Sequence, residues 1–172
     1  DLPAFDIEID IDLENSQAIL MDTFNETVDG KDLVYLYGYG VWDKAISNNW
    51  KSATFDSFSN YSDTDEGECE VLLAMWNYLI TQISLAEKQE KSIGIFHYSP
   101  HEKTWWRRFA KRHMGKPGVP TPEEVEKFCE KYLVDLYAYT QKISFPTISY
   151  SIKSLAPVAN FKWSVEDPGG GM

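Results

Sequence analysis

Cysteine and histidine are scarce in this chain, and their scarcity excludes two common kinds of small protein. The 172 residues include two cysteines, Cys69 and Cys129, and three histidines. Small secreted domains stapled by disulfides need more cysteines, and these two lack the close spacing of a zinc or redox motif. His101-Glu102 begins like the HExxH motif of zinc proteases, but Trp105 stands where the second histidine is required. A zinc centre built on histidine is therefore not indicated.

Long apolar runs and the glycine motifs of several enzyme classes are also missing. No apolar run approaches the roughly 18 residues that cross a bilayer, and no secretion signal stands at the start of the chain. We therefore predict no membrane span and a reducing, cytoplasmic location. The patterns GxxxxGK[ST], GxSxG and GxGxxG do not occur. Phosphate loops, serine-hydrolase elbows and dinucleotide-binding turns are accordingly not indicated.

Hydrophobic residues, by contrast, are plentiful. They make up 43% of the chain, and aromatic residues make up 15%, which is enough for a folded core. The length fits one domain, so we predict a single domain over residues 1–172. The chain starts at Asp1 and ends with a glycine run at 169–171 and Met172. We therefore expect a piece of a longer protein, with other domains as its partners.

The spacing of the apolar residues changes along the chain. A period of two predicts strands, and a spacing of three and four predicts helices. The predicted strands cover residues 5–12, 33–42, 52–59 and 92–98. The predicted helices cover 65–87, 99 to the break at Pro117, 121–132, a short segment after Asp135, and 151–158. Because strands come first and later strands alternate with helices, we predict a mixed α/β fold with a partly antiparallel sheet.

Local signals add detail to this outline. Residues 13–32 have no clear period and end in the turn signal Asp29-Gly30. Gly38 and Gly40 fall on one face of the second strand, where a helix or a ligand can approach the backbone closely. Three helix starts carry a serine or threonine with an acid three residues later, namely Ser62 with Asp65, Ser99 with Glu102, and Thr121 with Glu124.

The first strand is the most distinctive segment. Residues 5–12 read FDIEIDID, so apolar and acidic residues alternate and the acids share one face. On that face Asp6 and Glu8 stand about 6.6–7 Å apart along the backbone. Carboxylates so placed can hold two divalent ions about 3.5–4 Å apart for phosphodiester hydrolysis. The alternative is a strand with one solvated face.

Charge is unevenly distributed. The net charge is −11, and residues 1–32 hold ten acids against Lys31 alone. Residues 101–116 hold six of the sixteen Lys and Arg residues, including every arginine. Such a basic segment can contact phosphates and position a nucleic acid, and a solvated helix face is the alternative. The candidate nucleic-acid-binding residues are Lys103, Arg107, Arg108, Lys111 and Arg112, with Lys116 beside them.

The acidic opening and four later stretches resemble a known family. The opening is similar to the first motif of DEDD-type exonucleases, which have the RNase H-like fold. More narrowly, the chain resembles the RNase H-like domain of predicted RecB-family nucleases over nearly its whole length. The later stretches are LVYLYG at 33–38, HYxxxEKT at 97–104, VDLY at 134–137 and SYSIKSL at 149–155, and EDPGG at 166–170 also fits.

The resemblance implies a fold and a set of site residues. The fold is an RNase H-like mixed sheet, with antiparallel first strands and then parallel strands, flanked by helices. Asp6 and Glu8 would be the first metal-binding pair, joined by Glu102 and supported by Asp135. Two Mg²⁺ or Mn²⁺ ions would be the cofactors. The family's last acid lies in a motif beyond the glycine run, outside these 172 residues, so the domain is expected to stop short of one metal ligand.

Several of these residues also have structural interpretations. Glu102 could complete a helix cap, and Asp135 could cap the following helix. Asp10 and Asp12 could be solvated or could support the metal ligands. The adjacent Trp105 and Trp106 are expected to pack in the core rather than stack on a base. His97 and His101 could act as a general base, although a structural hydrogen bond is the commoner role.

Together these observations predict a metal-dependent nuclease, a 3′–5′ exonuclease that hydrolyses DNA, or RNA, by a two-metal mechanism. One alternative is a catalytically degenerate RNase H-like module that binds nucleic acid or scaffolds a larger nuclease or helicase. A further alternative is an acidic cation-binding domain that does not bind nucleic acid.

Overall fold

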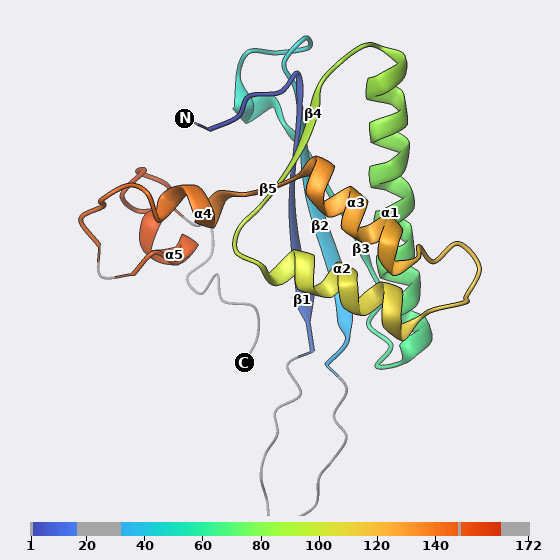
Figure 1. Ribbon diagram of the computed structural model, residues 1–172. Coiled ribbons are helices and arrows are strands. Elements are labelled where there is room, and N and C mark those ends of the chain that lie inside the picture. Colours follow the sequence, from blue (N-terminus) through green and yellow to red (C-terminus); the bar gives the residue numbers. More distant parts are fainter. Residues whose placement is uncertain (1, 17–31, 148, 163–172) are drawn as a thin grey trace, which may run out of the picture.

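The computed structural model describes residues 2–16, 32–147 and 149–162 (Figure 1). The predicted turn at Asp29-Gly30 and the EDPGG stretch at 166–170 lie outside the described residues. The strands are β1 (Ile7–Asn15), β2 (Val34–Asp43), β3 (Thr54–Ser59), β4 (Ile93–His97) and β5 (Leu133–Asp135). The helices are α1 (Asp65–Lys88), α2 (His101–Arg112), α3 (Pro122–Tyr132), α4 (Leu136–Thr140) and α5 (Ile152–Leu155), with a 3₁₀ turn, η1, at Trp50–Ser52.

The described strands form a mixed five-stranded sheet in the order β3-β2-β1-β4-β5. β2 is antiparallel to both β1 and β3, whereas β4 runs parallel to β1 and β5 runs parallel to β4. The prediction of a mixed α/β fold with a partly antiparallel sheet is thereby confirmed. β1 is the central strand, so its side chains meet neighbours on both sides.

The alternation in β1 places its apolar and acidic residues on opposite faces of the sheet. Ile9, Ile11 and Leu13 are buried, whereas Asp10 and Asp12 are exposed. The helices α1, α2 and α3 lie together on one side of the sheet, and α4 and α5 lie beyond its β5 edge (Figure 1). Burial of the apolar face under α1–α3 accounts for the core, and the acids are left on the other face.

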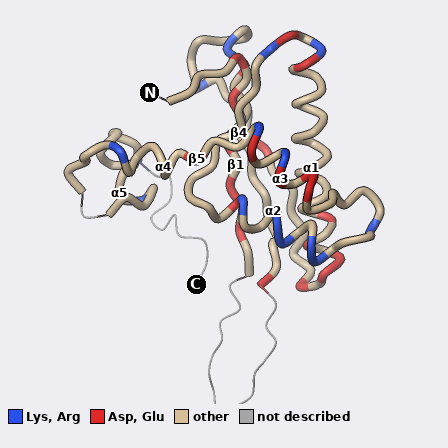
Figure 2. Tube along the Cα trace, viewed as in Figure 1, with Lys and Arg blue, Asp and Glu red and all other residues tan. Residues whose placement is uncertain are grey.

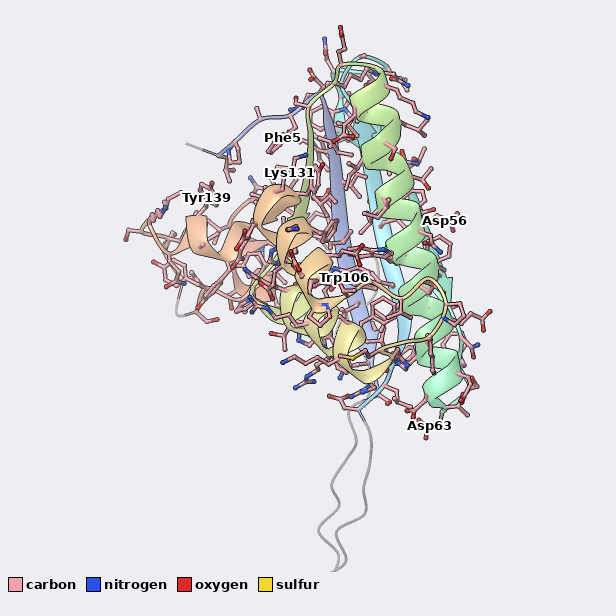
Figure 3. All side chains as sticks on the ribbon, turned by 45° about the vertical axis from the view of Figure 1, so that its right-hand side comes forward. Phe5, Asp56, Asp63, Trp106, Lys131 and Tyr139 are labelled. Atoms are coloured by element: carbon pink, nitrogen blue, oxygen red, sulfur yellow. The ribbon has the colours of Figure 1, made fainter. Side chains whose placement is uncertain are left out.

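The core itself is aromatic. Trp105 and Trp106 of α2 are both almost fully buried, which confirms the expectation that they pack inside. The Trp106 ring stacks on Tyr37 of β2, with 5.3 Å between ring centroids, and contacts Trp76 of α1 edge-on. Figure 3 shows Trp106 between the helices and the sheet. The Trp106 ring also contacts Phe128 of α3 edge-on, at 6.1 Å between ring centroids, so the sheet, α1 and α3 all contribute to its burial.

α1 is the one helix of the described residues that is long and apolar enough, by length and composition, to cross a membrane. Its apolar side chains serve the core instead. Leu72, Met75 and Leu79 are completely buried, and the helix packs along β2. Its apolar content is therefore explained by packing against the sheet.

A buried acid of α1 joins this helix to the start of β2 and to the end of α2. Glu68 of α1 is 1% exposed. Its Oε1 accepts hydrogen bonds from the Val34 backbone N–H at 3.1 Å and from Arg112 at 2.6 Å, and its Oε2 accepts one from His113 Nε2 at 2.7 Å. Since a buried carboxylate is tolerated only with such partners, Glu68 holds the start of β2 and the end of α2 against α1.

Several predicted element boundaries differ from those observed. β1 begins at Ile7 rather than at residue 5 and continues to Asn15, and α5 covers Ile152–Leu155 rather than 151–158. α1 is capped by the side chain of Thr64, which accepts from the Gly67 N–H, instead of by Ser62. The capping box of Thr121 and Glu124 at the start of α3 is confirmed.

The prediction that Ser99 caps α2 is wrong. Ser99 has a left-handed φ of 82°, and α2 follows Pro100 without a side-chain cap. The Ser99 N–H donates instead to Asp135 Oδ1 at 3.0 Å. This contact ties the connection between β4 and α2 to the start of α4.

Candidate functional site

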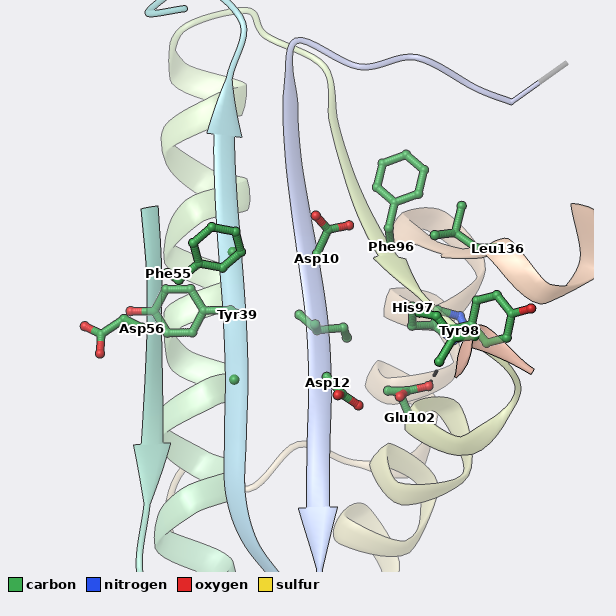
Figure 4. A pocket seen from close by; sticks show the side chains of 14 residues that line it. Asp10, Asp12, Tyr39, Phe55, Asp56, Phe96, His97, Tyr98, Glu102 and Leu136 are labelled. Atoms are coloured by element: carbon green, nitrogen blue, oxygen red, sulfur yellow. Dashed lines mark hydrogen bonds and ion pairs between the residues drawn. The ribbon is translucent and has the colours of Figure 1, made fainter. Parts of the chain in front are cut away.

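A cavity of about 510 Å³ lies on the acidic face of the sheet. β1 forms its floor, β2 and β3 form one wall, and the end of β4 with the first turn of α2 forms the other (Figure 4). The polar residues that line it are Asp10, Asp12, Tyr39, Asp56, His97, Tyr98 and Glu102, and its apolar lining includes Phe55, Phe96, Leu136 and Ile152. The acids come from strands and a helix far apart in the sequence.

Sheet register explains why Asp12 and Glu102 come together. β1 and β4 run parallel, with Asp10 level with Phe96. β4 ends one residue later at His97, and the first turn of α2 occupies the space beyond that end. Asp12, two residues along β1, therefore faces Glu102 across the cavity (Figure 4).

Burial and the clustered charge together raise the pKa of both strand acids. Burial in the walls of the cavity, reinforced by the nearby carboxylates of Glu102 and Glu14, raises the pKa of Asp12 to about 6. Burial also raises the pKa of Asp10, with a smaller effect of Glu8. Both side chains still reach solvent. Removal of water and like charge act in the same direction here, because each disfavours the charged form.

Glu102 is held in place by a buried histidine. The Glu102 and His97 side chains are 4% and 3% exposed. His97 Nδ1 lies 2.7 Å from the Ser99 carbonyl oxygen and 3.2 Å from Glu102 Oε2. Because both partners can only accept, Nδ1 carries the proton and donates to them. Glu102 thus contacts His97, in place of the helix cap considered above.

Asp135 acts as a helix cap. Its Oδ1 accepts from the Tyr137 N–H at 2.9 Å, at the start of α4, as well as from the Ser99 N–H. Asp135 is not among the residues that line the cavity. The capping role weighed from the sequence is observed, and the carboxylate supports the connection that carries Glu102.

Asp6 and Glu8 are not brought together with Glu102. Both Ser92 groups, Oγ at 2.6 Å and N–H at 2.7 Å, donate to Asp6 Oδ2, and these bonds lower the pKa of Asp6. Glu8 Oε1 lies 2.5 Å from Lys44 Nζ. Neither residue lines the cavity. They lie beside the start of β4, since Ile7 is level with Ile93, whereas Glu102 follows the end of β4.

Asp10 and Asp12, which were expected to be solvated or supporting residues, are the strand acids that line the cavity. The alternation that marks the strand continues through Glu14, and it gives no reason to prefer one acid over the next. Which acid of β1 faces Glu102 depends on the position along β1 at which β4 ends. That register is a contact between segments some eighty residues apart.

The arginines expected to contact nucleic acid are largely engaged within the protein. Both Nε and Nη2 of Arg107 donate to Glu126, at 2.5 and 2.8 Å. Arg112 bonds to Glu68 and to the Asp32 carbonyl oxygen, and the Arg108 guanidinium lies 4.8 Å from the Trp105 ring centroid. Figure 2 shows these basic residues along α2, apart from the acids of β1. Within the described ranges, Lys103 and Lys111 form no ion pair.

The donor chemistry of the cavity fits hard divalent cations. Asp10, Asp12 and Glu102 offer carboxylate oxygens, which are the ligands that Mg²⁺ and Mn²⁺ prefer. In the part of the chain that the structure describes, no three His, Cys, Asp or Glu side chains form a ready-made metal cluster. Asp10, Asp12 and Glu102 are the carboxylates that the cavity would offer to such an ion.

Comparisons with protein-family models, with curated proteins and with solved structures gave no match.

Proposed function

We propose that this domain is a divalent-metal-dependent nuclease that hydrolyses phosphodiester bonds of DNA, with the polarity of a 3′–5′ exonuclease. The observation that carries the proposal is the convergence of Asp12 and Glu102, with Asp10, on one cavity. Burial in the cavity, reinforced by the charge of Glu102, raises the pKa of Asp12 to about 6. Clustered carboxylates of this kind are relieved by bound cations, and a cation among carboxylates is the usual apparatus of phosphodiester hydrolysis.

The plan of the sheet supports the RNase H-like part of the proposal. Its first three strands in sequence are antiparallel, β4 joins the other side of β1 in parallel, and β5 extends that edge. This is the arrangement that the resemblance implies. The candidate acids lie on the central strand and just beyond the end of β4, as a site shared by these two strands requires.

The site residues of the proposal are Asp10, Asp12 and Glu102, with Asp12 and Glu102 as the principal pair. Asp6 and Glu8, the first metal-binding pair implied by the resemblance, are replaced in this role. Asp135 is a positioning residue, because it holds the connection that leads into α2. His97 orients Glu102 through Nδ1. Divalent ions bound by the acids would supply charge neutralisation at the phosphate and activation of water.

The test compares a substitution in β1 with one at the residue just before this strand. Asp12→Asn should lower metal-dependent cleavage of end-labelled single-stranded DNA by about a hundredfold or more, as loss of an essential electrostatic group does. Asp6→Asn, the matched control, should keep the activity of the wild type. Both proteins are assayed with Mg²⁺ and with Mn²⁺, and with a chelator as the blank.

The other outcomes have definite meanings. Loss of activity in Asp6→Asn but not in Asp12→Asn would indicate that the active site lies at Asp6 and Glu8 instead. A wild-type protein that binds DNA but cleaves neither end in either metal would favour the degenerate nucleic-acid-binding module. Metal binding without any affinity for DNA or RNA would favour the cation-binding domain.

A further inference from the structure

β3 forms an open edge of the sheet. It stands last in the strand order, and among the described strands it pairs with β2 alone. Five of its six residues are exposed, and Phe55 is 73% exposed. Edge strands that stay unpaired are normally protected by lysine, proline, a bulge, a covering element or very short length. β3 reads TFDSFS, with Asp56 as its one charge, and no bulge interrupts its register with β2.

The opposite edge of the sheet is protected in the usual way. β5 has three residues, and α4 and α5 lie beyond it (Figure 1). A strand that is so short and so covered offers little to a further strand. The contrast makes β3 the edge at which another chain could add a strand.

Hydrogen bonding to β2 fixes which backbone groups of β3 point outward. The Asn60 N–H donates to the Tyr35 carbonyl oxygen at 2.9 Å, and the same register continues along the strand. In an antiparallel pair, residues bonded to the neighbouring strand alternate with residues whose N–H and C=O point away from it. The even-numbered residues of β3 therefore bond to β2, and the backbone groups of Phe55, Ser57 and Ser59 point outward.

A local bond agrees with this direction in the middle of the strand. The Ser57 N–H donates to Asp56 Oδ1 at 2.8 Å, and not to β2. Figure 4 shows Asp56 directed away from β2, at the outer side of the strand that carries it. A strand added here would replace the carboxylate by a backbone carbonyl oxygen and release the carboxylate to solvent. Because one hydrogen bond replaces another, the exchange weakens such pairing without preventing it.

We propose that two copies of this chain pair through β3, antiparallel about a two-fold axis at Ser57, so that their two sheets become one. This inference goes beyond the proposed function and does not depend on it. A second copy fits because the outward groups are complementary to themselves. With Ser57 opposite Ser57 of the second copy, Phe55 lies opposite Ser59, and every outward N–H of one strand meets a carbonyl oxygen of the other. Each large ring also lies opposite a small side chain.

The charges along the edge favour this register. Asp56 lies level with Phe58 of the second copy, whereas an axis at Asp56 itself would place two carboxylates directly opposite each other, which is destabilising. Beyond the paired residues, the same register brings Lys51 toward Asp63 of the second copy. Both residues are exposed, so the two ends of the interface would carry opposite charges.

The joined sheet would present both acidic cavities on one face. A two-fold axis perpendicular to the sheet keeps like faces together, and the two copies of β1 would lie five strand spacings apart, about 24 Å. One six-residue strand from each copy makes a small interface. We therefore expect a weak dimer, with a dissociation constant of about 10–100 μM.

The first experiment is sedimentation of the protein over a range of concentrations up to about 300 μM. The wild type should change from monomer to dimer. Ser57→Pro removes an outward N–H but no bond to β2, so it should weaken the dimer by about a hundredfold or more. Ser57→Ala, the matched control, keeps the N–H and should dimerise like the wild type. Asp56→Ala should tighten the dimer about threefold, because the competing carboxylate is gone.

The second experiment tests the register and does not depend on the proline variant being folded. Across the axis the two Ser57 Cα atoms would be about 5.5 Å apart, within the range of about 4.4–6.8 Å that a disulfide spans. Ser57→Cys should therefore form a cross-linked dimer under mild oxidation. Ser59→Cys is the control, because its two copies would be more than about 13 Å apart. The wild type is the blank, since Cys69 and Cys129 are buried.

Three results would overturn the inference. A wild type that stays monomeric at the highest concentration would show that copies of this chain do not pair at the edge. A dimer that persists in a folded Ser57→Pro protein would place the interface elsewhere. Cross-linking of Ser59→Cys but not of Ser57→Cys would rule out the two-fold axis at Ser57. None of these results bears on cleavage of DNA, so the proposed function would be unaffected.

Discussion

At the scale of single residues, one carboxylate shows how the cavity differs from the rest of the acidic strand. Asp6, just before β1, and Asp12, within β1, have the same side chain, yet their pKa values move in opposite directions. Hydrogen bonds from Ser92 lower the pKa of Asp6. Burial and the charge of Glu102 raise that of Asp12. The surroundings of each carboxylate, and not its residue type, therefore decide whether its pKa is raised or lowered, and the acid with the raised pKa would gain more from a bound cation.

Asp12 should destabilise the folded protein at neutral pH. Its pKa is higher in the folded protein than the ordinary value of 3.8, so the folded state binds the proton more tightly. Stability is then lost as pH rises from about 4 to about 6. We expect Asp12→Asn to raise the free energy of unfolding at pH 7 by about 1 kcal/mol, less than the ~3 kcal/mol of an unscreened shift because the carboxylate reaches solvent.

The measurement is urea unfolding at two pH values. The gain from Asp12→Asn should vanish below about pH 3, where the carboxyl is protonated in both the folded and the unfolded state. Added Mn²⁺ should stabilise the wild type more than the variant, because an ion that binds only the folded protein shifts the equilibrium towards it. A substitution that is equally stabilising at both pH values would show that the ionisation of Asp12 is not the cause of the gain.

At the scale of elements, the sequence predicted strand and helix types better than their ends. The period of two in β1 and the apolar stripe of α1 were sufficient, because each spans many residues. β5 was missed because it has three residues, Leu133–Asp135, and directly joins two helices. The Ser99 cap was wrong because Ser99 has a left-handed φ, whereas a capping residue has an extended backbone. The Ser99 N–H, which a capping box would give to Glu102, donates instead to the distant Asp135.

The candidate site was predictable only in part for the same reason. The acidic face of β1 and the position of Glu102 after β4 follow from local patterns. Which acid faces Glu102 depends on the parallel register of β1 and β4, and no local pattern encodes that. No local pattern singled out Phe55, since the position of its ring against β2 depends on the missing side chain at Gly40 in the neighbouring strand.

The buried acid of α1 makes a prediction about how the elements are held together. Glu68→Ala removes the shared partner of Arg112 and His113 and of the Val34 N–H. Breaking a buried charged group in this way costs about 3–5 kcal/mol. We expect a loss of that order in the free energy of unfolding. Glu66→Ala, an exposed acid in the same first turn, should cost a few tenths of a kcal/mol.

The readout is chemical denaturation monitored by tryptophan fluorescence, since α2 carries Trp105 and Trp106. A Glu68→Ala protein as stable as the Glu66→Ala control would show that Arg112 and His113 find solvent when their partner is gone. In that case the cluster would not be what fixes α2 against α1.

At the scale of the whole molecule, the net charge of −11 limits how a nucleic acid can approach. Most of the arginine charge of α2 is neutralised by acids of α1 and α3. The lysines Lys103 and Lys111 remain on the same helix. Electrostatic attraction to a nucleic acid should therefore depend on these two lysines more than on the arginines that the sequence predicted as phosphate contacts.

Salt titration of DNA binding tests this distribution of charge. For single strands each neutralised phosphate contributes about 0.7 to the slope of log affinity against log salt, so replacing both lysines by alanine should lower the slope by about 1.4. Arg107→Ala should leave the slope unchanged, because Glu126 already holds its guanidinium. Lys88→Ala, at the carboxyl end of α1, is the control. An unchanged slope in the double variant would place the phosphates elsewhere.

A single oxygen atom, Oδ1 of Asp135, accepts both the N–H of Ser99 and that of Tyr137. The turn before α2 and the start of α4 consequently share one anchor, and neither can be displaced without disturbing the other. Because Glu102 projects from the helix that this turn introduces, a neighbouring domain that pulls on α4 would change the position of that carboxylate. A displacement of α4 would therefore be passed to Glu102 through Asp135 and the turn at Ser99.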